Sequence, residues 1–279
     1  MTIVSLRHEP QLLEPFIAFF ASHWGNEPLY RDCMTAALAT PAPLPQWFLM
    51  LDDRQQPIAG CGLISNDFNA RMDLCPFLAA LFVEESHRGQ ALGGLLLDHA
   101  RRQCAILGFP TLHLITDHCG YYERYGFDFR GHVAEPGGGS ARLYAAPAIC
   151  GWDELVAAAT ATLNPRRLSD TAETGGVAAA LLAPSGRIYT GVCLDTACSL
   201  GFCAERNAIG TMLTHGESHV LKLVAVGAHR LLPPCGACRE LLLQLDPRNA
   251  DSQVLCHWPN PIVRTLAELM PLNWRDIQD

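Results

Sequence analysis

Pro234-Cys235-Gly236-Ala237-Cys238 places two cysteines three positions apart, and Cys203-Ala204-Glu205 precedes this segment in the chain. Helical spacing from Cys203 to Leu213 and from Ala237 to Leu245 predicts that both segments lie at the starts of helices. Three thiolates brought together there can hold a zinc ion and leave one tetrahedral position open, as catalytic zinc sites require. Helix N-termini also stabilise thiolates through the helix dipole and the free amides.

Glu205 stands two residues after Cys203, so it can lie beside a metal ion without coordinating it. A ligand followed by this glutamate, with Pro-Cys-x-x-Cys downstream, is typical of zinc deaminases. The carboxylate can then take a proton from water and deliver it to a ring nitrogen and to the leaving ammonia. Two other interpretations stay open: a structural zinc site, which normally has a fourth protein ligand, and a thioredoxin-like redox pair, which would not need Cys203.

The pattern of predicted elements restarts after Pro147, so we expect two domains, residues 1–147 and 148–279. In the second, helices are predicted over 152–163, 203–213, 237–245 and 266–270, and strands over 176–182, 188–192, 221–226 and 254–257. In the first, helices are predicted over 10–20, 30–38 and 92–107, and strands over 47–51, 58–64, 77–83, 111–115, 127–133 and 141–144. Both domains are therefore expected to be α/β.

The second domain resembles the free-nucleoside cytidine deaminases over roughly residues 150–273. The resemblance lies in four segments, Gly176–Leu182, Gly186–Val192, Cys203–Ile209 and Pro234–Glu240. It implies a three-layer α/β/α sandwich that assembles as a homo-oligomer, a tetramer or a dimer, with active sites completed by neighbouring copies. It also implies zinc held by Cys203, Cys235 and Cys238, with Glu205 as the proton carrier. By the same resemblance, Arg206 offsets the surplus negative charge of three thiolates.

One departure from that family concerns the substrate. Cytidine deaminases place Asn and Glu, two residues apart, where this chain has Cys193 and Asp195. Cysteine cannot supply the paired donor and acceptor of an amide, and aspartate reaches less far than glutamate. The chemistry of deamination is expected to persist, while cytidine is not assured as the substrate. Enzymes related to blasticidin S deaminase keep the metal core and change this region.

A glycine-rich turn in the first domain joins a predicted strand to a predicted helix. Such a turn presents amide donors to an anion, although a plain tight turn would read the same way. Arg88–Gly93 and Tyr121–Phe127 are similar to the acetyl-CoA and Tyr-Glu-x-x-Gly-Phe segments of GNAT acetyltransferases, a resemblance that covers about residues 3–145. It implies that acetyl-CoA binds at nine residues: Phe82, Val83, Arg88, Gly89, Gln90, Ala91, Leu92, Gly93 and Gly94.

The same resemblance assigns Tyr122 as the acid that protonates the departing CoA thiolate. A core aromatic that packs the end of the sheet is the alternative for Tyr122. Glu84 is a candidate general base acting through water, or a solvated surface carboxylate. The sequence does not identify the acyl acceptor, because loops such as Asn66–Leu74 are the variable part of this fold.

Composition excludes several classes of partner. The formal net charge is −8, and it divides into −5 for residues 1–147 and −3 for residues 148–279. Neither half offers the clustered Lys and Arg that nucleic acid requires, and no apolar stretch reaches the length that spans a bilayer. No export signal is visible, so we expect a cytoplasmic protein whose 12 cysteines are reduced thiols or metal ligands.

The sequence therefore predicts a bifunctional enzyme with Zn²⁺ and acetyl-CoA as cofactors and small nucleoside-type molecules as substrates. It would pair an acetyl-CoA-dependent N-acetyltransferase with a zinc deaminase of a cytosine nucleoside or cytosine nucleoside antibiotic. One alternative is a pyrimidine-salvage cytidine deaminase with a CoA-binding regulatory domain. Another is a zinc-stabilised oligomerisation platform, although the presence of Glu205 speaks against it.

Overall fold

The computed structural model describes residues 1–272, and the chain divides into two compact units. Unit 1 comprises Met1–Cys104 and Thr111–Ile149, and unit 2 comprises Ala105–Pro110 and Cys150–Asp279. Each unit has its own β-sheet with helices packed on it, so the α/β fold class is confirmed in both halves. No helix within residues 1–272 is long and apolar enough to cross a membrane.

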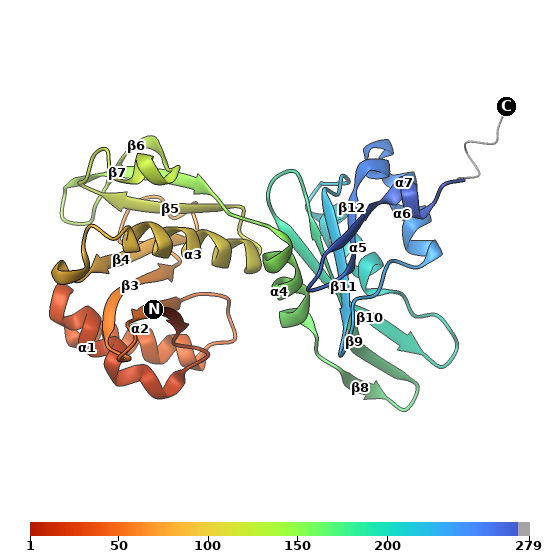
Figure 1. The fold of residues 1–279 in the computed structure, drawn as a ribbon, viewed down its shortest axis with the longest axis horizontal. Coiled ribbons are helices and arrows are strands. Elements are labelled where there is room, and N and C mark those ends of the chain that lie inside the picture. The colour runs from red at the N-terminus through yellow and green to blue at the C-terminus, as the bar shows by residue number, and fades with distance from the viewer. Residues whose placement is uncertain (273–279) are drawn as a thin grey trace. The chain divides into compact units, whose positions relative to one another are not determined.

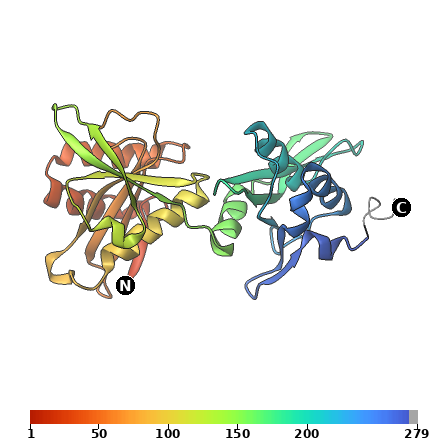
Figure 2. The same cartoon turned by 90° about the horizontal axis from the view of Figure 1, so that it is seen from above.

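Unit 1 is built on a seven-stranded sheet in the order β1-β2-β3-β4-β5-β7-β6. Its strands are β1 (Thr2–Ser5), β2 (Gln46–Leu51), β3 (Pro57–Ile64), β4 (Phe77–Val83), β5 (Thr111–Thr116), β6 (Asp128–Ala134) and β7 (Ser140–Pro147), and its helices are α1 (Leu13–Trp24), α2 (Glu27–Ala39) and α3 (Leu92–Ile106). Side chains alternate between the two faces of a strand, so Leu49 packs with α1 and α2 while Phe48 meets His99 of α3. The red and yellow helices thus cover opposite faces of the sheet (Figure 1, Figure 2).

Strands β4 and β5 separate in the middle of this sheet. They run parallel and pair at Phe77 and His113. Beyond that pair, Leu78–Leu81 and Leu114–Thr116 line one cavity instead of bonding to each other. A bulge in β4, where Ala80 has a φ of 51°, bends the strand at the same place. The sheet therefore opens into a wedge at the carboxyl ends of its two central strands.

Unit 2 is a six-stranded sheet with helices on both faces. Its path runs β10-β9-β11-β12-β13, and β8 also pairs with β9. The strands are β8 (Arg166–Ser169), β9 (Ala172–Leu182), β10 (Ile188–Thr196), β11 (Lys222–Gly227), β12 (Gln253–His257) and β13 (Ile262–Thr265), and the helices are α4 (Trp152–Thr162), α5 (Ala204–Thr214), α6 (Gly236–Leu245) and α7 (Leu266–Leu269). Leu181 of β9 packs with α5, α6 and α7, and α4 covers the other face (Figure 1). This is the expected three-layer sandwich.

Candidate functional site

Three thiols converge in unit 2, as the cysteine spacing predicts. The Sγ atom of Cys235 lies 3.5 Å from that of Cys203 and 3.5 Å from that of Cys238, and all three sulfurs lie within 4.8 Å of one another. Thiolates bound at about 2.3 Å to one tetrahedral zinc ion would be separated by about 3.8 Å. The three sulfurs therefore fit a zinc ion, and this is the metal-ligand cluster that the structure holds within residues 1–272.

Two helix N-termini position these thiols. Cys203 is the N-cap residue of α5 and Cys235 that of α6, and Cys238 lies in the first turn of α6. Burial raises the pKa of the Cys235 thiol, but hydrogen bonds from the Cys238 backbone N–H and from neighbouring thiols outweigh it and bring the pKa below its ordinary value. Burial raises the pKa of Cys203 and Cys238. Thiolates at the latter two positions therefore need a cation beside them.

Glu205 lies in the first turn of α5 and is buried, with 4% of its surface exposed. Burial raises the pKa of its carboxyl group, and contacts with Cys238 and Arg206 offset part of that rise. A raised pKa makes the carboxylate a better proton acceptor than an ordinary exposed glutamate, as a group that receives and returns a proton requires. The structure thus brings the predicted proton carrier to the predicted thiol cluster.

A cavity of about 490 Å³ lies over this cluster. Cys193, Asp195, Cys203, Glu205 and Cys235 all line it, so the two positions that depart from the cytidine deaminase pattern line the same space as two of the three clustered thiols. The Cys193 thiol donates to Oδ2 of Asp195 at 3.3 Å and accepts a hydrogen bond from the Val177 N–H at 3.3 Å. Phe202 and Leu232 also line the cavity, and no motif in the sequence marks either residue as part of the site.

Arg206 lines this cavity too, one residue after the proton carrier. Its guanidinium donates to the Gly201 carbonyl at 3.3 Å, and its buried Nε has no hydrogen-bond partner within the described residues. Its charge lowers the pKa of Glu205, which is the direction expected of a cation that offsets negative charge at the site. Its predicted action on the thiolates remains a prediction.

Close packing holds α5 against the sheet. A Cβ atom at Gly191 of β10 would collide with the backbone of Ala204 and Ala208, so only glycine allows the helix to approach this strand so closely. The Asn207 amide donates to the Val192 carbonyl at 3.0 Å and ties the two elements together. This contact fixes the height of Glu205 above the sheet.

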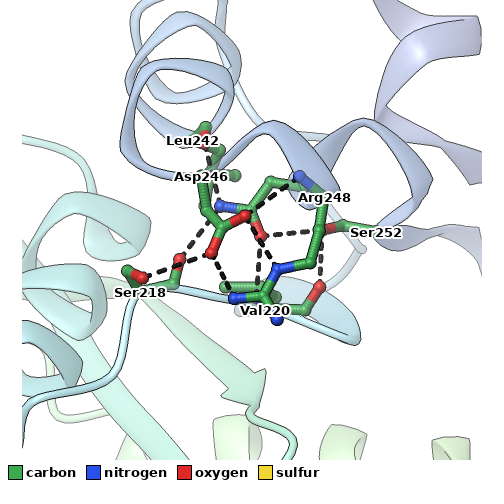
Figure 3. A network of polar contacts seen from close by, with 7 residues as sticks. Ser218, Val220, Leu242, Asp246, Arg248 and Ser252 are labelled. Atoms are coloured by element: carbon green, nitrogen blue, oxygen red, sulfur yellow. Dashed lines mark hydrogen bonds and ion pairs between the residues drawn. The ribbon is translucent and has the colours of Figure 1, made fainter.

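A polar network anchors the other end of α6. The buried side chain of Asn249 accepts from the Val220 N–H at 2.8 Å and donates to the carbonyls of Ser218 and Leu242 at 3.0 and 2.9 Å. Figure 3 shows the neighbouring Asp246 turned toward Arg248 and Ser218, at 2.6 and 3.3 Å. The helix that presents Cys235 and Cys238 is thereby joined to the start of β11.

The glycine-rich turn of unit 1 leads into α3 and borders a cavity of about 740 Å³. Because α3 begins at Leu92, the amides of its first turn have no acceptor within the helix and are free for an anion. Gly89 and Ala91 adopt positive φ angles of 80° and 58°. Seven of the nine predicted acetyl-CoA residues line the cavity: Phe82, Val83, Arg88, Gly89, Ala91, Leu92 and Gly93. Gln90 and Gly94 are not among its lining residues.

Tyr122 lies where this cavity meets a second one. It is buried, lines the 740 Å³ cavity, and also lines a cavity of about 870 Å³ inside the wedge of the sheet. Burial, more than any neighbouring group, raises the pKa of its hydroxyl to about 12. The hydroxyl therefore stays protonated at neutral pH, which is the state in which it can donate a proton.

Glu84 is held elsewhere. Its Oε1 lies 2.9 Å from Nε2 of His23, whose ring stacks on Phe82, and Glu84 lines neither cavity. The larger cavity is bordered by residues that sequence reasoning did not single out, among them Trp24, Tyr30, Trp47, Asp67 and Glu135. These come from five separate segments, so no spacing in the sequence links them.

Comparison with known proteins finds a match in each half. The sequence model of the acetyltransferase (GNAT) domain matches residues 45–128. A solved GNAT-family acetyltransferase of Staphylococcus aureus Mu50 is 18% identical, with a TM-score of 0.40, and the match covers 53% of this chain and 100% of that one.

In the other half, the chain is 36% identical to a cytidine deaminase of Halalkalibacterium halodurans over 99 residues, which are 34% of this chain and 74% of that protein. It is 31% identical to a blasticidin-S deaminase of Bacillus cereus over 109 residues, which are 35% of this chain and 76% of that protein.

Proposed function

The chain belongs to the cytidine deaminase family and also carries a GNAT acetyltransferase domain, and from this premise we propose that it is a bifunctional enzyme acting on cytosine nucleoside antibiotics. Unit 2 would remove the exocyclic amino group of the base by hydrolysis, and unit 1 would acetylate an amine with acetyl-CoA. One observation above all supports the deaminase: three thiols form a cluster, and two of them line one cavity together with a buried glutamate. The domain bounds that we propose are residues 1–147 and 148–279.

In the deaminase, Cys203, Cys235 and Cys238 would hold the zinc ion, which supplies Lewis-acid activation of water when bound. Glu205 would take a proton from the attacking water, pass it to the ring nitrogen, and later protonate the leaving ammonia. Its burial keeps bulk water away from these transfers. Arg206 would offset the surplus negative charge of the three thiolates.

Cys193 and Asp195 support the choice of substrate. Both line the cavity, and their hydrogen bond to each other occupies groups that would otherwise contact the substrate. A site loses much affinity for a ligand when a hydrogen-bonding partner is missing, so an unmodified ribose should bind weakly here. The carboxylate of Asp195 would suit a substrate that carries positive charge. The similarity to a blasticidin-S deaminase agrees with this preference.

In the transferase, the free amides before α3 would bind the pyrophosphate of acetyl-CoA, and the acyl group would reach the junction where Tyr122 lies. A side chain at Gly93 would run into the hydroxyl of Tyr121, so the glycine keeps this part of the cavity clear. Tyr122 would give its proton to the CoA thiolate as that group departs.

The deaminase proposal is tested with Cys238→Ala and Glu205→Gln. The purified protein should contain close to one zinc per chain, and Cys238→Ala should lose most of it. Glu205→Gln should keep the zinc, since it is not a ligand, yet deaminate at least about 100-fold more slowly. Asp153→Asn, an exposed change on α4, is the charge-matched control and should alter neither property. Zinc that resists Cys238→Ala, or full activity in Glu205→Gln, would contradict the mechanism.

A further inference from the structure

The 870 Å³ cavity of unit 1 opens onto the junction where Tyr122 lies. It shares Trp24, Leu81, His118 and Tyr122 with the 740 Å³ cavity over the glycine-rich turn. A molecule in the larger cavity would therefore approach acetyl-CoA at its reactive end. Its volume is that of pockets that take drug-sized ligands.

The carboxylates that line this cavity give it a negative charge. Asp67, Asp117 and Glu135 line it, and no lysine or arginine of the described residues does so. Its remaining walls are largely aromatic and apolar, and the buried indole N–H of Trp47 has no hydrogen-bond partner within residues 1–272. Carboxylates and aromatic faces together attract an organic cation.

Asp67 is held in place by its own loop. The Asn66 side chain accepts from the Asn69 N–H at 3.0 Å, and the Ala70 N–H donates to the Ala134 carbonyl at 3.0 Å. The second bond joins the loop to the end of β6, directly before Glu135. The two carboxylates are thus positioned by connected backbone rather than by flexible side chains alone.

The electrostatic coupling of Asp67 reaches the junction of the cavities. Burial, and then the charge of Glu135, raise the pKa of Asp67 to about 6. Burial first, with Asp67 among the weaker causes, raises the pKa of Tyr122 to about 12. Asp67 and Tyr122 line one cavity, and the charge of Asp67 contributes to the raised pKa of the Tyr122 hydroxyl.

We propose that Asp67 and Glu135 form an ammonium-binding subsite, and that Asp67 accepts the proton which the acceptor amine must lose before it attacks. This inference rests on the proposed acetyl transfer and assigns it an acceptor class. The acceptor is a primary amine that enters as a cation and carries a flat or apolar body against the aromatic walls.

The protons balance without a further reactant. The ammonium gives one proton to the Asp67 carboxylate, which releases it to solvent. The free nitrogen attacks the thioester carbon, so a C–N bond forms and the C–S bond breaks. The leaving thiolate takes the Tyr122 proton, and the tyrosinate regains one from the nitrogen of the new amide. The products are the acetamide, the CoA thiol and one released proton.

The titratable groups that share the cavity with Asp67 are Tyr30 and Cys33 of α2, Asp117 and His118 after β5, Tyr122, and Glu135 after β6, and the lining residues of α1, β2, β3, β4 and β7 are not titratable. Among them only His118 can carry positive charge. Asp67 must be ionised to accept a proton, so kcat/KM should rise with pH through about 6.

The test is to measure how fast the full-length protein acetylates tryptamine. The release of the CoA thiol is followed at pH values on both sides of about 6. Asp67→Asn should lower kcat/KM about 100-fold and abolish the rise, with acetyl-CoA affinity unchanged. Asp32→Asn removes a charge from the exposed side of α2 and should keep both the rate and the rise. An Asp67→Asn profile that superimposes on the wild type would overturn the role of Asp67.

A binding measurement separates this inference from the proposed function. Calorimetry without acetyl-CoA should show tryptamine binding at least about tenfold more tightly than its neutral analogue tryptophol, and Glu135→Gln should reduce the difference. Equal affinities would overturn the ammonium subsite. A clear preference for tryptamine in a protein that acetylates no amine would contradict the acetyl transfer and leave the cation subsite standing.

Discussion

The buried carboxyl group of Glu205 is the group of unit 2 whose charge most needs compensation. Glu205 has 4% of its surface exposed, and a carboxyl group is buried this deeply only where its charge is compensated or used. Arg206 supplies part of that compensation, and the N-terminus of α5 supplies more. A cation held by the three thiols would complete it, which is why the glutamate and the thiols belong to one site.

Tyr122 is the residue on which acyl transfer should depend at its last step. Because we propose that its hydroxyl donates a proton to the leaving thiolate, Tyr122→Phe should lower kcat by at least about tenfold and leave acetyl-CoA affinity nearly unchanged. Steady-state rates with a primary amine, together with calorimetry of acetyl-CoA binding, would measure both. Phe129→Leu, a change to an exposed aromatic of β6, is a control that should affect neither. Lost affinity at an unchanged kcat would show that Tyr122 packs or binds rather than donates.

Residues of one site can be predicted from the sequence where they are close together in the chain. Cys235 and Cys238 are predictable because their spacing places both thiols at one helix start. Asp67 and Glu135 are not, because the wedge between β4 and β5 brings them to one cavity from loops far apart in the sequence. The predicted role of Glu84 illustrates the same limit, since its contact with His23 of α1 has no signal in the sequence.

At the scale of elements, the helices that present the thiols depend on interior polar contacts as much as on apolar burial. Removing the Asn249 side chain leaves the Val220 N–H and two carbonyls without partners, so Asn249→Ala should destabilise unit 2 by about 2–4 kcal/mol. Hydrogen exchange would measure the effect: amides of α6 and β11 should exchange faster, and those of β2 in unit 1 should not.

Asn260→Ala serves as the matched control, because Asn260 is exposed and its side chain makes no contact that supports α6. It should leave exchange in unit 2 unchanged. Equal protection of α6 in Asn249→Ala and in the wild type would show that the network does not stabilise the helix.

Most helices and strands were predictable from the periodicity of apolar residues, and the strands that were missed are short and lie at sheet edges. The helix predicted over 152–163 is α4, and the strand predicted over 77–83 is β4. The short edge strands β1, β8 and β13 have no counterpart in the sequence analysis. Every residue of β8 is exposed, so its side chains show no alternation between a buried and a solvated face. The helix predicted from residue 203 begins at Ala204, because Cys203 is its cap.

At the scale of the whole molecule, two units with separate cavities occur in one chain. The three clustered thiols lie in unit 2 and the glycine-rich turn lies in unit 1, so each of the two proposed reactions would use residues of one unit. We propose that both cavities favour substrates that carry positive charge, because Asp67, Asp117 and Glu135 line the larger cavity of unit 1 and the Asp195 carboxylate lines that of unit 2. A cytosine nucleoside antibiotic with amino groups meets both requirements, whereas cytidine meets neither.

Mass spectrometry tests directly whether one protein deaminates and acetylates the same antibiotic. The zinc-loaded, full-length protein is incubated with acetyl-CoA and either blasticidin S or cytidine. The antibiotic should gain about 1 mass unit by deamination and about 42 by acetylation, with a deamination kcat/KM at least about tenfold above that for cytidine. Cytidine deaminated about tenfold more efficiently than the antibiotic, with no acetylated product, would contradict the account and identify a pyrimidine-salvage enzyme.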